Sequence, residues 1–193
     1  MNAERRKPLR AAFRDWWGQS LGGDPRWDNG AARKARAELR RAANPAEALC
    51  VAATHDLRHR LADAGDKRDW RLRDGPQRLA LVAATLAAVE AQAPATLPAL
   101  FGRPEGEGER RALSHLRFQR IVRETDPWRL AVLLRRALPL AGHAANVGRL
   151  GEDLLFWGDD VRSRWCFDYF GSVPPDTLDP DADTETTPES EDA

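Results

Sequence analysis

The chain has few of the residues and segments on which cofactor-dependent and membrane-spanning proteins rely. Its 193 residues include two cysteines, one methionine and one tyrosine, and no apolar run approaches the length that spans a membrane. Cys50 and Cys166 fit no metal or redox spacing, so we expect two small buried thiols in a cytoplasmic protein. RRKPLR at 5–10 carries twin arginines, but no apolar segment follows, which argues against export. There is no GxxxxGK[ST] loop and no GxGxxG turn after a strand, and we predict no cofactor.

Charge is distributed unevenly along the chain. Residues 171–193 hold eight acidic residues and no lysine or arginine, so residues 1–170 hold all 30 basic residues against 22 acidic ones, a net charge of +8. The acidic tail is rich in Pro, Asp, Glu and Thr and has almost no large apolar side chains, so we predict that it is disordered. The basic body indicates a polyanionic partner, because bound cations release condensed counterions from phosphate.

The apolar pattern is helical throughout and predicts an all-α protein of two packed helical bundles with about eight or nine helices. The predicted bundles cover residues 1–93 and 109–170, and a segment rich in proline and charge at 94–108 is expected to link them. The helices are expected at 4–21, 31–43, 45–64, 76–93, 109–124, 127–138, 147–157 and 159–170.

Several of these helix ends carry local signals. Asn44, Pro45 and Glu47 stand in the order of an N-cap, a first-turn proline and an acidic N3 residue. Asp126 is likewise followed by proline, and Pro139 should end or kink the helix before it. We interpret the acidic pair 159–160 as complementing a helix dipole.

Two histidines deserve consideration as metal ligands. His55 and His59 lie at i, i+4 on a predicted helix, but the metalloprotease motif requires Glu where Asp56 stands. No third histidine lies at a useful spacing downstream, and the HD class of phosphohydrolases needs a histidine upstream of His55. We predict no metal site and no catalytic residues. A small metal-dependent hydrolase is kept as an alternative that metal analysis of the purified protein would test.

The aromatic residues fall into two groups. One group lies on apolar helix faces and is expected in the core rather than in base-stacking platforms: Phe13, Trp16, Trp157 and Trp165. Trp27 and Trp70 lie in polar loops near arginines, where a partner surface and an ordinary exposed loop are equally good interpretations.

Arginines recur at helical spacing in the second half of the chain. Arg117, Arg120 and Arg123 stand at every third position and predict a cationic ridge, and Arg135 and Arg136 add a pair on the next helix. Each arginine alone could belong to a solvated face with local ion pairs. Clustered on a body of net charge +8, they favour a surface that binds a polyanion.

Five short motifs occur in a fixed order. They are Arg36-Ala37-x-Leu39-Arg40-Arg41, Arg117-Phe118-Gln119-Arg120 with Arg123, Leu134-Arg135-Arg136, Trp157-Gly158, and Val161-Arg162-x-Arg164-Trp165 leading to Asp168-Tyr169-Phe170. In this order they resemble the CasB family, the small subunit of the type I-E CRISPR surveillance complex, Cascade. The resemblance covers residues 10–170 and is strongest over 113–170.

The resemblance implies a non-catalytic all-α subunit in antiviral defence. Family members lie as a tandem pair along the complex, against its backbone subunits and near its large subunit, and help to hold the target or displaced DNA strand opened by guide RNA. By resemblance, the residues facing nucleic acid are Arg40, Arg41, Arg117, Arg120, Arg123, Arg135, Arg136 and Arg162. Lys34, Arg111 and Arg164 are added on position alone.

Two features depart from the family, and one alternative function stays open. Asp159-Asp160 follows the Trp-Gly pair where relatives can place basic residues, and the acidic tail is not a family feature. We hypothesise that the tail shields the basic face before assembly. The alternative is an assembly adaptor whose arginines meet acidic protein surfaces, without direct contact to nucleic acid.

Overall fold

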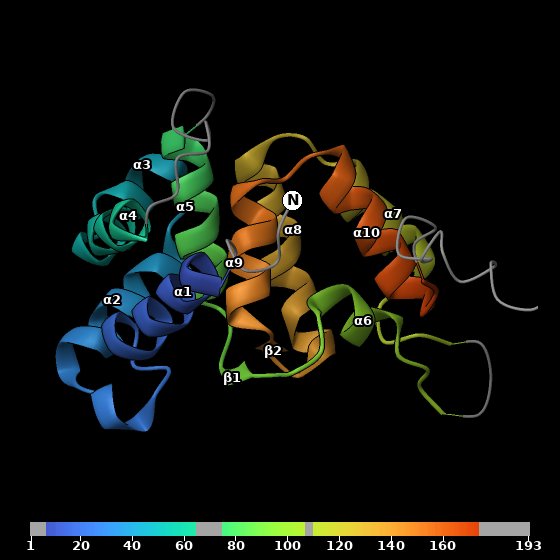
Figure 1. The fold of residues 1–193 in the computed structure, drawn as a ribbon, viewed down its shortest axis with the longest axis horizontal. Helices are drawn as coiled ribbons and strands as arrows, with labels where there is room; N and C mark the ends of the chain where they lie inside the picture. Colours follow the sequence, from blue (N-terminus) through green and yellow to red (C-terminus); the bar gives the residue numbers. More distant parts are fainter. Residues whose placement is uncertain (1–6, 65–74, 107–109, 174–193) are drawn as a thin grey trace, which may run out of the picture.

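The computed structural model describes residues 7–64, 75–106 and 110–173 and confirms an all-α fold (Figure 1). The described helices are α1 Lys7–Ser20, α2 Gly30–Arg41, α3 Pro45–Leu49, α4 Ala52–Asp63, α5 Gly75–Leu86, α6 Leu97–Gly102, α7 His115–Arg123, α8 Pro127–Ala137, α9 Val147–Leu155 and α10 Asp159–Phe170. Short 3-10 turns, η2 Pro25–Trp27 and η4 Leu138–Ala141, join them. Strands β1 Ala91–Gln92 and β2 Ala144–Ala145 form a two-residue parallel pair.

The described residues contain two more helices than the ranges predicted, because the expected helix 45–64 is divided and the expected linker 94–108 contains α6. The division falls at Val51, which is extended (φ −81°, ψ 122°) and buried. The Thr54 hydroxyl donates to the carbonyl oxygen of Ala48, 2.7 Å away, across this break. Because the β-branched Val51 is extended, the chain changes direction between α3 and α4, and Leu57 of α4 is also buried in the core.

The prediction of a helix over 76–93 is wrong beyond Leu86. After Leu86 the chain turns, and the carbonyl oxygens of Ala87 and Val89 are satisfied from another part of the molecule. Arg36 of α2 donates to both oxygens, and the indole of Trp17 donates to Val89, 3.1 Å away. These side-chain donors replace the hydrogen bonds that a longer helix would have made.

The hydrophobic core is continuous between the two predicted bundles. α5, which is apolar nearly all round, is buried against α3, α8 and α9, and α1 packs on α9 and α4. α6 lies against α10, so part of the segment expected to be a linker belongs to the packed body (Figure 1). The predicted disorder of the acidic tail concerns residues that, apart from 171–173, lie outside those described.

The helix ends for which the sequence carried local signals are confirmed. The Asn44 side chain accepts from the backbone N–H of Glu47 at 3.0 Å, and that of Asp126 accepts from Arg129 at 2.7 Å. α8 ends two residues before Pro139, and Asp159 and Asp160 lie in the first turn of α10.

The predicted core aromatics are also confirmed, since Phe13, Trp16, Trp157 and Trp165 are all buried. Trp157 and Trp165 meet edge to face with ring centroids 4.9 Å apart. Trp27 is 49% exposed, and Trp70 lies outside the described residues. Among the helices that the structure describes, none is both long and apolar enough to cross a membrane.

Candidate nucleic-acid interface

The residues predicted to face nucleic acid fall into groups with different surroundings. Arg135 of α8 has a structural role, because its side chain is engaged with the backbone of the chain itself. Its Nη1 donates to the carbonyl oxygens of Arg40 and Ala42, at 3.1 and 3.2 Å, where α2 ends. The guanidinium also lies over the ring of Trp128, 5.1 Å from the centroid. Burial lowers the pKa of Arg135, and the neighbouring charge of Arg136 acts in the same direction. Arg135 therefore fastens the end of α2 to α8.

Arg111 performs a comparable structural role between α6 and α10. Its Nη1 donates to the carbonyl oxygens of Gly102 (2.6 Å) and Tyr169 (3.0 Å), near the ends of these two helices. The guanidinium also lies 5.1 Å from the Tyr169 ring and 5.4 Å from the Phe170 ring. On α7, Phe118 stacks on Tyr169 at 4.0 Å, so Arg111 lies at the junction of three helices.

Arg164 on α10 is paired with a buried carboxylate. Asp153 of α9 is 3% exposed and accepts from Arg164 Nη2 at 2.8 Å and from Trp165 Nε1 at 2.9 Å, with Arg149 Nε 3.3 Å away. Burial raises the pKa of Asp153, against the opposing effects of Arg149, the Trp165 N–H and Arg164. Arg162 is half-buried and pairs with Asp159 at 3.1 Å.

The three basic residues predicted on α2 are exposed. Lys34 lies 3.9 Å from Glu38, and Arg40 pairs with Glu90 at 3.1 Å. The Arg41 guanidinium has no hydrogen bond or ion pair to any residue that the structure describes. α2 and α7 lie on opposite sides of the view in Figure 1, so the structure does not bring these residues to the arginines of α7.

The remaining predicted arginines form one surface. Phe118 and Ile121 are buried and fix the orientation of α7, which leaves Arg117, Arg120 and Arg123 exposed; Arg136 of α8 is exposed beside them. Within residues 7–64, 75–106 and 110–173, none of the four guanidinium groups has a hydrogen bond or an ion pair. We call Arg117, Arg120, Arg123 and Arg136 the α7 arginine face.

Three adjoining hollows follow this face. The middle one, about 330 Å³, is bordered by Arg117, Arg120 and Arg136 and has apolar walls that include Leu133 and Leu140. It shares Arg117 and Leu140 with a hollow of about 800 Å³ toward the end of α10, and Arg120 with one of about 370 Å³ near Arg123. The arginines therefore line several neighbouring hollows rather than a single pocket.

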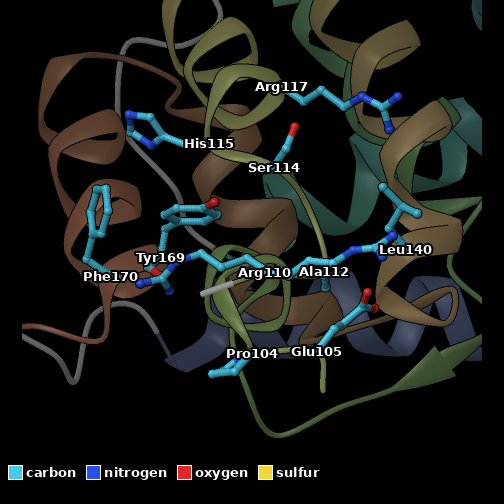
Figure 2. Close-up of a pocket in the computed structure, with 11 residues that line it drawn as sticks. Pro104, Glu105, Arg110, Ala112, Ser114, His115, Arg117, Leu140, Tyr169 and Phe170 are labelled. Atoms are coloured by element: carbon cyan, nitrogen blue, oxygen red, sulfur yellow. The ribbon is translucent and has the colours of Figure 1, made fainter. Parts of the chain in front are cut away.

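Figure 2 shows the larger hollow and a residue that the sequence reasoning missed. Arg110 lines it together with Arg117, His115 and the 51%-exposed Phe170. The signal for Arg110 was present in the Arg110-Arg111 pair, but only Arg111 was selected, on position alone, and its side chain donates to the carbonyl oxygen of Gly102. The guanidinium that lies beside the exposed Phe170 ring is that of Arg111, 5.4 Å from the ring centroid, whereas Arg117 lies across the hollow from Phe170 (Figure 2). The hollow therefore combines guanidinium groups, which suit phosphate, with an exposed ring on which a base can stack.

Among the described residues, no third candidate metal ligand joins His55 and His59. His55 Nε2 lies 2.8 Å from the carbonyl oxygen of Leu49. In the part of the chain that the structure describes, no group of three or more His, Cys, Asp or Glu residues could hold a metal ion.

The fold and this surface define a class: a small all-α protein with a cationic face along one surface helix. A family model for CRISPR-associated protein Cse2 matches residues 35–170. The chain belongs to this family, the Cse2 or CasB small subunits of type I-E Cascade, as its ordered motifs indicated, and is therefore a subunit of a CRISPR Cascade complex. No curated protein and no solved structure matches the chain.

Proposed function

We propose that this Cascade subunit is non-catalytic and binds the backbone of the DNA opened by guide RNA, on the target or the displaced strand. The α7 arginine face is the observation that carries the proposal, because its four exposed guanidinium groups have no partner among the described residues. Its partners would be that DNA, the guide RNA, the backbone and large subunits, and a second copy of the chain in the complex.

The physical argument depends on charge rather than on sequence reading. Base pairing with the guide identifies the target, and the exchange of one duplex for another is nearly balanced in free energy. Phosphate contacts worth a few kcal/mol on an opened strand would shift that balance toward the open state. A guanidinium suits this task because its fork of N–H donors matches two phosphate oxygens at once.

The test is binding of the purified full-length chain to single-stranded and duplex DNA over a series of salt concentrations. The informative variant is Arg117→Gln with Arg120→Gln. Its control is Arg14→Gln with Arg58→Gln, which removes the same charge from exposed positions on α1 and α4, across the molecule in Figure 1. We expect steep salt dependence that is indifferent to sequence, with the log–log slope reduced by roughly 1.4 on single strands only in the first variant.

Equal slopes in the two variants would contradict a phosphate-binding role for the α7 arginine face. They would favour the assembly adaptor instead, which also has an observation behind it. Leu116 on α7 is 78% exposed and lines the hollow beside Arg120 and Arg123, as a residue at a protein interface would. In that case nucleic acid would not compete with the protein partner.

A further inference from the structure

We propose that the acidic tail, residues 174–193, docks on the α7 arginine face of its own subunit and covers it until a stronger polyanion displaces it. The docking itself needs only the charges of this chain. Its effect on nucleic-acid binding rests on the function proposed above.

The last residue of α10 lines one of the arginine-lined hollows. α10 stops at Phe170, Gly171 takes a left-handed conformation (φ 68°), and the N–H of Ser172 closes the turn on the carbonyl oxygen of Phe167 at 3.0 Å. Phe170 lines the hollow of about 800 Å³ that also contains Arg117 (Figure 2). Val173 is 68% exposed. The tail therefore follows directly on a helix whose last residue, Phe170, lines a hollow that Arg117 also lines.

The charge and the length of the tail both suit docking on the α7 arginine face. Residues 174–193 carry eight carboxylates and no basic residue, while the face has four guanidinium groups without partners in the described structure. Twenty extended residues reach on the order of 60 Å, and the nine residues of α7 span about 14 Å, so reach does not limit docking. A tethered segment also has an effective concentration of about a millimolar, which makes weak contacts sufficient.

The composition of the tail indicates what kind of contact this is. Leu178 is its one leucine, and the tail has no isoleucine, valine, methionine or aromatic residue. Docking would therefore be mainly electrostatic and would weaken as salt is added. A tethered tail is also favoured over the tail of a second copy, because intramolecular docking does not depend on protein concentration.

Docking can be measured without nucleic acid. A spin label on Ser190→Cys, in a full chain with Cys50→Ser and Cys166→Ala, should broaden the amide signals of α7 at low salt and release them at high salt. The broadening should vanish with Arg117→Gln and Arg120→Gln together but persist with the matched pair at Arg14 and Arg58. No broadening, broadening spread evenly over the molecule, or broadening that grows with protein concentration would each overturn the proposal.

The consequence for binding is a second measurement on the full-length chain. All eight tail carboxylates are neutralised by Asp176→Asn, Asp179→Asn, Asp181→Asn, Asp183→Asn, Glu185→Gln, Glu189→Gln, Glu191→Gln and Asp192→Asn. We expect affinity for single-stranded DNA at low salt to rise about twofold to tenfold, given a millimolar effective concentration. A control with Thr177, Thr184, Thr186 and Thr187 changed to Asn should leave the affinity unchanged.

The two measurements separate the two proposals. Docking without any DNA binding by the isolated chain would refute the proposed function and leave the docked tail in place. DNA binding that does not change when the tail is neutralised, together with no spin-label effect, would refute the docked tail and leave the proposed function in place.

Discussion

Arg135 donates from Nη1 to the backbone carbonyl oxygen of Arg40, 3.1 Å away, so one arginine predicted to face nucleic acid holds the backbone of another. The next residue along α8, Arg136, points to the hollow shared with α7 and has no partner in the described residues. Two consecutive arginines on one helix therefore have different roles. One stabilises the packing of α2 on α8, and the other is free for a ligand.

The pair provides a matched test of this difference. Arg135→Ala removes two charge-assisted hydrogen bonds and the contact with Trp128, and should lower the free energy of unfolding by about 2 kcal/mol. Arg136→Ala should change it by less than about 0.5 kcal/mol, because an exposed side chain without partners is lost. Urea denaturation of both variants measures the contrast, and equal stabilities would show that Arg135 has no structural role.

A second prediction concerns the buried carboxylate of Asp153. Asp153→Ala leaves the charges of Arg149 and Arg164 without their partner and removes the acceptor of the Trp165 indole. We expect a loss of about 3 kcal/mol in unfolding free energy. Asp160→Ala, at an exposed position in the first turn of α10, should cost less than about 1 kcal/mol. If the two substitutions cost the same, the Asp153 cluster contributes nothing to stability.

Gly102 permits the close approach of α6 to α10. A Cβ built at this position would lie 1.9 Å from the carbonyl oxygen of Tyr169 and 2.7 Å from its carbonyl carbon. Since both are backbone atoms, Gly102→Ala must push α6 and α10 apart. We expect the free energy of unfolding, measured by thermal or chemical denaturation, to fall by about 3 kcal/mol. Gly30→Ala, where a Cβ meets nothing within 4 Å, should be neutral or stabilising by up to about 1 kcal/mol. A stable Gly102→Ala protein would contradict the packing described here.

The capped helix starts and the core could be predicted from the sequence because their causes are local. Asn44 and Asp126 cap the helices that follow them through bonds spanning three residues, and Trp16 and Trp165 lie on apolar stripes visible in the sequence. The exposed arginine ridge on α7 could be predicted from the sequence equally well. Arg117, Arg120 and Arg123 recur at helical spacing and share the helix with buried Phe118 and Ile121.

The role of each individual arginine could not be read in this way. What separates Arg135 from Arg136, or Arg111 from Arg110, is which neighbouring element each side chain meets, and that depends on tertiary packing. The premature end of α5 has the same kind of cause, because its replacement donor, Arg36, comes from α2. Guanidinium groups bind backbone carbonyls as readily as phosphates, so composition and spacing alone cannot tell the two uses apart.

Salt dependence separates the two uses by experiment. Arg120→Ala removes an exposed cation of the α7 arginine face, and should reduce the log–log salt slope of single-strand binding by about 0.7 without lowering the thermal midpoint. Arg164→Ala removes the same formal charge from a half-buried pair with Asp153, so it should lower the midpoint and leave the slope nearly unchanged. The reverse pattern, with the slope lost in Arg164→Ala and the midpoint lost in Arg120→Ala, would move the interface from α7 to α10.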